Sequence, residues 1–112
     1  MAVTPPAVPA LDEGARDFLK ALASETRQQV MMLFAGGAEL SVGEVAEQAG
    51  LGQSTVSEHL TLLRRGGLLT STRTGKTVRY RTDAAKVIAR MEELKTYLLA
   101  CCPPTDCGDN GC

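Results

Sequence analysis

The stretch from residue 41 to residue 83 changes its periodicity halfway, and this change restricts the possible folds more than any other feature of the sequence. Before residue 66 the apolar residues Val56, Leu60 and Leu63 follow a helical spacing. After residue 68 apolar and polar residues alternate, so Val78 and Tyr80 would face one side of a strand and two arginines the other. The stretch therefore predicts helical structure followed directly by strands.

Start and stop signals divide the helical part into two short helices. Ser41 and Glu44 fit a capping box, in which the serine hydroxyl accepts from the third amide and the glutamate reaches back. The helix that follows is expected to end at Gly50, and the next to run from about Gln53 to just before Gly66. Two helices joined by a short glycine-containing turn are the signature of a helix-turn-helix.

The alternating part is predicted to form a β-hairpin over residues 69–73 and 77–82, because Gly75 can supply the positive φ of a tight turn. This hairpin is basic. The net charge of the 112 residues is −1, yet no acidic residue lies between His59 and Thr82. A local excess of cations suits a polyanion such as nucleic acid, although an isolated cluster of this kind is more simply a solvated surface.

Helical spacing also predicts a helix over residues 11–22, a second from Ser24 to the glycines at 36 and 37, and a long one after Asp83. The long helix carries an apolar stripe that nothing else in the chain is left to cover. A second copy of the chain is the expected partner, in a two-fold homodimer.

The predicted fold is thus mainly α with a β-hairpin wing (an α+β fold), in the order four helices, two strands and one helix. The proline-rich residues 1–10 are expected to form a flexible arm. Residues 11–100 would form the DNA-binding and dimerisation domain, and residues 101–112 a cysteine-rich tail that binds an inducer.

The polar face of the helix at residues 53–65 is predicted to enter the major groove of double-stranded operator DNA, with the hairpin as the wing of a winged helix-turn-helix. Glutamine can read adenine, serine and threonine contact bases or phosphates, and the hairpin cations suit flanking phosphates. The predicted DNA-binding residues are Gln53, Ser54, Thr55, Ser57, His59, Arg73, Lys76, Arg79 and Arg81. For His59 a packed, hydrogen-bonded role is an equally good interpretation.

Three segments of the chain carry a resemblance to a known family: LASETRQQVMMLF, LSVGEVAEQAGLGQSTVSEHLTLLRRGGLL and RTGKTVRY. Residues 15–100 resemble the ArsR/SmtB family of metal-responsive repressors in the order and spacing of these segments. The resemblance implies a homodimeric winged helix-turn-helix repressor that an inducer releases from its operator.

All four cysteines lie in the last dozen residues, at Cys101, Cys102, Cys107 and Cys112. Clustered thiols in a reducing compartment favour a soft ion over a disulfide, and their spacing is not the paired C-x2-C of structural zinc sites. Adjacent cysteines on a helix point about 100° apart, so both can face one ion only where the helix has ended. The prolines at 103 and 104 predict an end by Cys101 or Cys102. A trivalent ion with three thiolates in a pyramid, such as arsenite or antimonite, suits this arrangement.

The family resemblance narrows the ligand set residue by residue. Other members would need thiols near Ser41 and Gly43, a histidine two residues after Asp83, or a cysteine in the second helix, and this sequence has none of them. What remains resembles the arsenic-responsive members with an adjacent cysteine pair after the last helix. That pattern implies the ligands Cys101, Cys102 and Cys107, with Cys112 as a weaker candidate.

Several alternatives stay open. The same repressor could sense methylarsenite or a thiophilic cation such as cadmium or lead, and the simplest interpretation of the tail is a disordered segment with idle cysteines. A thiol redox enzyme or a metal-buffering protein is the alternative from another class, but no redox C-x-x-C or catalytic base is evident, so we expect no enzyme. The sequence shows no leader or membrane-length apolar segment, so a cytoplasmic protein without membrane association is expected.

Overall fold

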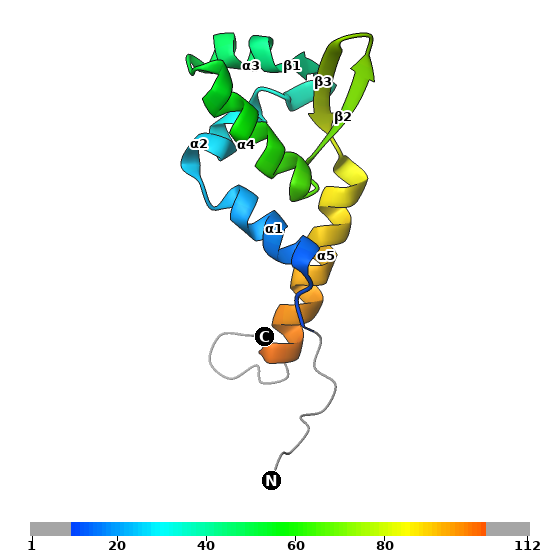
Figure 1. The fold of residues 1–112 in the computed structure, drawn as a ribbon. Helices are drawn as coiled ribbons and strands as arrows, with labels where there is room; N and C mark the ends of the chain where they lie inside the picture. The colour runs from blue at the N-terminus through cyan, green and yellow to red at the C-terminus, as the bar shows by residue number, and fades with distance from the viewer. Residues whose placement is uncertain (1–9, 103–112) are drawn as a thin grey trace.

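The computed structural model describes residues 10–102, which form five helices around one small sheet (Figure 1). The elements in chain order are α1 (Glu13–Leu22), α2 (Glu25–Met32), the 3-10 turn η1 (Ala35–Gly37), β1 (Leu40–Ser41), α3 (Val42–Ala49), α4 (Gln53–Arg65), β2 (Leu69–Thr74), β3 (Thr77–Thr82) and α5 (Ala84–Cys101). The predicted winged helix-turn-helix, mainly α with a β-hairpin wing, is confirmed.

Side-chain caps determine where the helices begin. The Asp12 carboxylate accepts the backbone N–H of Ala15 at 2.8 Å, so α1 begins at Glu13 rather than near residue 11. The predicted capping box of α3 is present, with Ser41 N donating to Glu44 Oε1 at 2.8 Å and Glu44 N donating to Ser41 Oγ at 3.2 Å. Helix α2 ends earlier than expected, at residue 32, and η1 covers the remaining distance to the glycines.

The sheet is antiparallel and has three strands in the order β1-β3-β2. Strands β2 and β3 are the predicted hairpin, and Gly75 at its turn has a φ of 63°. The sequence did not predict β1, whose residues Leu40 and Ser41 pair with Tyr80 and Arg79. Two residues are too few to show an alternating pattern, so the signal that predicts the hairpin is absent here. Strand β1 ties the entry of α3 to the hairpin.

One apolar core joins the first four helices to the base of the sheet. The predicted inner face of α4, made by Val56, Leu60 and Leu63, is completely buried. Phe18 of α1 and Phe34 after α2 are the aromatic members of this core. Because three residues of α4 lie in the core, the outward face of that helix is set by the core packing.

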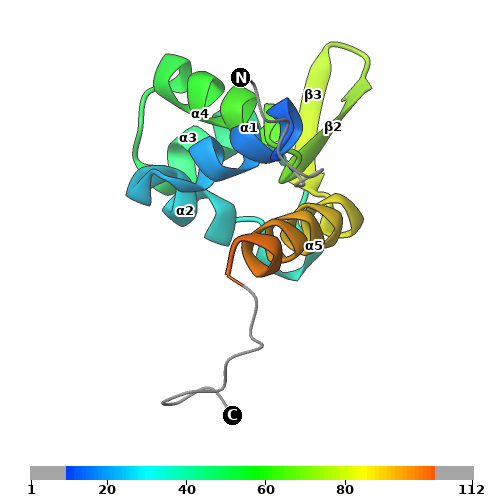
Figure 2. The same ribbon diagram turned by 90° about the horizontal axis from the view of Figure 1, so that it is seen from below.

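Helix α5 leaves the base of the hairpin and extends past the body of the domain (Figures 1 and 2). Val87 and Leu94 pack against the core, but no residue of α5 is fully buried. The helix ends at Cys101, and Cys102 has a non-helical φ of −133° and ψ of 73°, as the following prolines predict. Within residues 10–102 none of the helices combines the length and apolar character needed to span a membrane.

Candidate nucleic-acid interface

Helix α4 presents a polar face on the side opposite its buried stripe. It packs against α1 on one side and α3 on the other, which fixes its position in the domain. Four of the predicted DNA-binding residues are exposed on it: Gln53, Ser54, Thr55 and Ser57. A shallow groove along the same helix is lined by Ser57, Glu58, Thr61, Leu62 and Arg65. The helix can therefore offer hydroxyl and amide groups to base edges without disturbing the core.

The start of α4 differs from the starts of the other α-helices. Asp12, Ser24, Ser41 and Asp83 each accept a backbone N–H of the helix they precede, whereas Gly52 before α4 has no side chain to do so. The first amides of α4 are thus left without a side-chain acceptor. Amides at a helix N-terminus bind phosphate well, so this end of α4 suits a DNA backbone.

His59 lies on α4 in contact with Arg27 of α2. The Arg27 guanidinium donates through Nε to the Ala21 carbonyl and through Nη2 to the Lys20 carbonyl, both at 2.9 Å. Its Nη1 lies 3.4 Å from Nδ1 of His59. Arg27 therefore satisfies two carbonyls at the end of α1 and links that end to α4. This contact favours the packed, hydrogen-bonded role for His59 over the DNA-contacting one.

Substitutions at His59 should separate these two roles. We expect His59→Leu, which removes the acceptor for Arg27, to lower the free energy of unfolding by about 0.5–1.5 kcal/mol. His59→Asn should retain most of the stability, because its amide oxygen can accept the same hydrogen bond. Urea unfolding measures both. If both variants unfold like the wild type but bind DNA more weakly, His59 is a DNA contact instead.

The hairpin cations fall into two groups. Arg79 and Arg81 on β3 form ion pairs with Glu44 at 3.1 Å and Glu39 at 4.0 Å. Arg73 and Lys76 near the turn are exposed and have no acidic partner within residues 10–102. The unpaired cations near the turn are consequently more available to phosphate than the paired ones along β3.

Glu44 has two partners, which connect the capping of α3 to the hairpin. The backbone N–H of Ser41, and then the Arg79 guanidinium, hold the pKa of Glu44 below its ordinary value. A lowered folded-state pKa stabilises the fold above the carboxyl titration, and this contribution is lost as the pH falls through the folded-state pKa. The carboxylate therefore remains charged at neutral pH and keeps competing with phosphate for Arg79.

The two groups of cations should differ in the salt dependence of DNA binding. Lys76→Ala is expected to reduce the slope of log affinity against log salt by about 0.9, because one phosphate contact is lost. Arg79→Ala should reduce the slope by less, since Glu44 already neutralises that guanidinium. Fluorescence anisotropy from low to moderate salt measures both slopes. Equal losses in the two variants would mean that Arg79 leaves Glu44 to bind phosphate.

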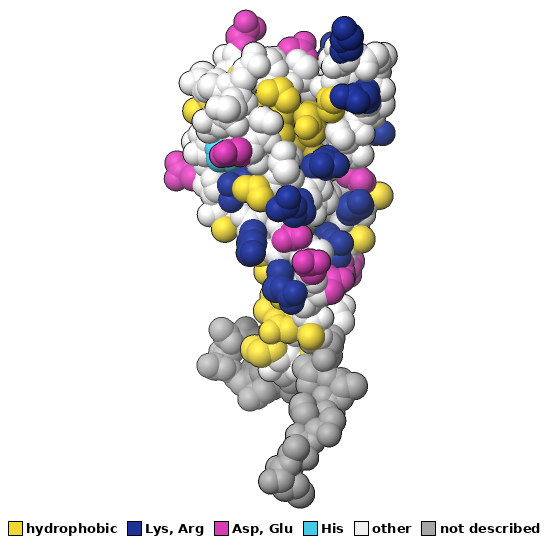
Figure 3. Space-filling view, in the orientation of Figure 1, with side chains coloured by type: hydrophobic (Ala, Val, Ile, Leu, Met, Phe, Trp, Pro, Cys, Tyr) yellow, Lys and Arg dark blue, Asp and Glu magenta, His cyan; other side chains and the backbone are white. Residues whose placement is uncertain are grey.

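Helix α5 exposes an apolar surface along its length. The side chains of Ile88, Met91 and Leu98 are 62%, 57% and 56% exposed, and Leu99 is 42% exposed. A hollow on this helix is lined by Met91, Leu94, Lys95, Leu98 and Leu99. Figure 3 shows hydrophobic side chains gathered over the lower part of α5. We call Ile88, Met91, Leu98 and Leu99 the apolar face of α5.

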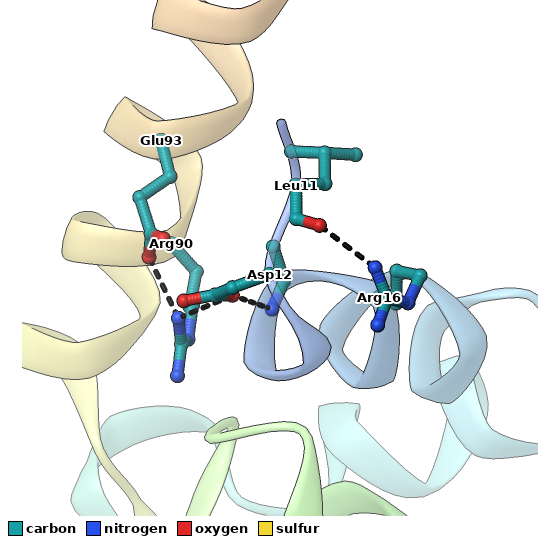
Figure 4. Close-up of polar contacts among 6 residues, drawn as sticks. Leu11, Asp12, Arg16, Arg90 and Glu93 are labelled. Atoms are coloured by element: carbon teal, nitrogen blue, oxygen red, sulfur yellow. Dashed lines mark hydrogen bonds and ion pairs between the residues drawn. The ribbon is translucent and has the colours of Figure 1, made fainter. Parts of the chain in front are cut away.

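Arg90 connects α5 to the start of α1 (Figure 4). Its Nη1 donates to Glu93 Oε1 at 2.8 Å and to Asp12 Oδ1 at 3.4 Å, and the same Asp12 oxygen caps α1. The guanidinium lies against Gly14, where the Cβ of any other residue would collide with it. The α1 cap is therefore part of the contact that sets the angle between α1 and α5.

The thiols of Cys101 and Cys102 lie together at the end of α5. Both are exposed, and the Cys102 Sγ–H donates to Cys101 Sγ across 3.4 Å. This hydrogen bond, followed by charge repulsion from Cys101, raises the pKa of the Cys102 thiol. The two other predicted ligands, Cys107 and Cys112, lie outside the described residues. Within residues 10–102 no group of three or more potential ligands is close enough to hold a metal ion.

Two arginines that join the helices were missed in the sequence. Arg27 is close to its Ser24 cap in sequence, but it contacts His59 thirty-two residues away. Arg90 contacts Asp12 at a separation of 78 residues. No local pattern predicts either contact, although the exposed position expected for a helical arginine could have been questioned at Gly14, since a glycine inside a helix often has a packing reason.

Comparison with known proteins identifies the relatives of this arrangement. A family profile described as a helix-turn-helix domain matches residues 22–72. The transcriptional activator HlyU of Vibrio cholerae is 41% identical over 76 residues, which cover 68% of this chain and 69% of that protein. The arsenical resistance operon repressor of Escherichia coli is 39% identical over 75 residues, which cover 62% of this chain and 64% of the repressor.

A solved structure extends the comparison to α5. The homodimeric winged helix-turn-helix DNA-binding domain of Mycobacterium bovis, described as a possible ArsR-family transcriptional regulator, superposes with a TM-score of 0.65 at 27% identity. The match covers 88% of this chain and 92% of that domain. The relatives therefore share the helix-turn-helix and hairpin on which the candidate interface is built.

Proposed function

The chain belongs to the ArsR/SmtB family of winged helix-turn-helix transcriptional regulators, and we propose that it is a homodimeric repressor released from operator DNA by arsenite or antimonite. As a member of this family it is a DNA-binding regulator rather than an enzyme. The observation that carries the inducer assignment is the pair of exposed thiols at the end of α5.

The spacing of these thiols supports a pyramidal ion. At a metal–sulfur bond length of about 2.3 Å, two sulfurs on a tetrahedral centre lie about 3.8 Å apart, whereas two on a pyramid with near-right angles lie about 3.3 Å apart. The observed separation between Cys101 Sγ and Cys102 Sγ is 3.4 Å. Trivalent arsenic and antimony bind thiolates in such pyramids. Cys101 and Cys102 would hold the inducer, with Cys107 as third ligand and Cys112 as a possible substitute.

The dimer part of the proposal rests on the apolar face of α5. Four large apolar side chains on one helix remain exposed in the protomer, which a monomeric soluble protein would seldom tolerate. A second copy of the chain, related by a two-fold axis, would cover them. The Mycobacterium bovis relative is homodimeric. Two copies of α4 would then read successive major grooves of one operator.

Inducer and operator bind at opposite ends of the protomer in this proposal, and α5 connects them. Its first half contacts α1 through Arg90, and α1 packs against α4. If the inducer weakens operator binding by a given factor, the operator weakens inducer binding by the same factor, typically about 5–150-fold. Arg90 and Asp12 are consequently the contacts through which a shift of α5 would reach α4.

A second candidate inducer is methylarsenite. It takes two thiolates, which is the number that the described residues bring together at Cys101 and Cys102. Cadmium and lead remain weaker candidates, because their longer bonds to sulfur call for wider spacing than 3.4 Å. The number of sulfurs on the bound ion therefore distinguishes the inducers.

The proposal is tested on the reduced full-length protein bound to a labelled operator, selected from random DNA. We expect arsenite or antimonite to weaken binding by about 5–150-fold in fluorescence anisotropy, and cadmium or lead to do so less. X-ray absorption of the arsenite-loaded protein should show three sulfur neighbours. Two sulfurs would favour methylarsenite, and release by cadmium but not by arsenite would overturn the assignment.

A further inference from the structure

The adjacent thiols at the end of α5 are placed for a second kind of chemistry. Cys102 Sγ lies 3.4 Å from Cys101 Sγ, with its hydrogen directed at that sulfur, and both side chains are exposed to solvent. Two thiols in contact and open to solvent can be joined by an oxidant. The described part of the chain contains no other pair of cysteines.

The backbone at this point permits a disulfide between neighbours but does not favour it. Cα atoms joined by a trans peptide are about 3.8 Å apart, while disulfides usually span about 4.4–6.8 Å between Cα atoms. Such a bond is strained, and strained disulfides are the easily reduced, regulatory ones. Because Cys102 has left the helical conformation, with φ −133° and ψ 73°, the linking residue can turn without breaking the helix.

We propose that Cys101 and Cys102 form a reversible vicinal disulfide in response to a peroxide, and that this bond closes the inducer site. The first statement concerns the two thiols alone. The second rests on the proposed function, because it assumes that these thiols are inducer ligands. Oxidation would therefore leave the regulator on DNA whether or not the inducer is present.

The chemistry balances with hydrogen peroxide as the oxidant. Cys101, the sulfur that accepts the hydrogen bond, attacks one peroxide oxygen, the O–O bond breaks, and a sulfenic acid and one water result. Cys102 then attacks the Cys101 sulfur, and the sulfenic oxygen leaves as a second water. Two thiols and one peroxide thus give one disulfide and two waters. A dithiol reverses the step by exchange and is itself oxidised.

The disulfide is tested in a Cys107→Ser/Cys112→Ser chain, which keeps only the adjacent pair. One equivalent of hydrogen peroxide should remove both titratable thiols and two hydrogen atoms from the intact mass, and dithiothreitol should restore them. The matched Cys102→Ser variant in this background should stop at a Cys101 sulfenic acid that a dimedone reagent traps. Sulfinic acid in the parent chain, or a disulfide between two chains, would overturn the proposal.

The closing of the inducer site is tested in the full chain, with the disulfide located by peptide mapping. The oxidised protein should bind the operator within about twofold of the reduced protein, but arsenite should no longer release it until dithiothreitol is added. Release of the oxidised protein by arsenite would overturn the gating. If the reduced protein fails to respond to arsenite, the proposed function fails, while the thiol titration still decides whether the disulfide forms.

Discussion

Met91→Glu should leave the protein monomeric and weaken its binding to a two-half-site operator by about 10²–10⁴-fold, the range over which linked binding events exceed single ones. Met91 is 57% exposed in the protomer and lies in the centre of the apolar face of α5. A carboxylate there meets water in the monomer but would have to be desolvated in a dimer interface. The fold should therefore survive while the assembly does not. Analytical ultracentrifugation and anisotropy measure the two effects.

A control on the same helix makes this prediction specific. Ala85 is exposed on α5 but lies outside the apolar face, so Ala85→Glu adds the same charge without blocking the dimer. We expect it to remain dimeric and to bind the operator like the wild type. A Met91→Glu protein that sediments as a dimer would show that α5 is not the interface and would leave its exposed side chains without a partner.

Local signals account for the part of the fold that the sequence predicts well. The bounds of α4 and of the hairpin follow from an apolar spacing, a glycine turn and an alternation, all of which are read within a few residues. The capping box of α3 is a contact between Ser41 and Glu44, only three residues apart. Such contacts depend on the chain near them and need no knowledge of the tertiary structure.

The contacts that join these elements depend on residues far apart and were not predicted. The pairing of β1 with β3 brings Ser41 to Arg79, and the cap of α1 receives Arg90 from α5. Both determine how the reading helix, the hairpin and α5 sit relative to one another. The sequence also treats Arg79 and Arg81 as free cations, whereas Glu44 and Glu39 pair with them. Charge counted along a chain cannot reveal partners brought together by folding.

The inducer site was predicted by the opposite route, from residue chemistry rather than periodicity. Four cysteines at one end of the chain indicate soft-ion chemistry whatever the backbone does. The structure adds the distance between Cys101 and Cys102, which composition could not provide. The remaining ligands lie outside residues 10–102, so their role is a prediction for experiment.

Replacing both adjacent cysteines, in a Cys101→Ser/Cys102→Ser protein, should abolish the response to arsenite without weakening operator binding. The wild type is expected to lose about 5–150-fold in affinity when arsenite is added, and the double variant to lose nothing measurable. Serine is nearly the same size, and both positions are exposed, so the fold has no reason to change. A serine hydroxyl stays protonated at neutral pH and is a hard ligand, so it cannot replace a soft thiolate.

Single variants of the other two cysteines then rank the third ligand. Cys107→Ser should retain weak release, because Cys101 and Cys102 alone still offer two thiolates at 3.4 Å. Cys112→Ser should respond to arsenite like the wild type and serves as the matched control for loss of one tail thiol. The order reverses if Cys112 is the third ligand. A double variant of Cys101 and Cys102 that arsenite still releases would place the site elsewhere and remove α5 from the mechanism.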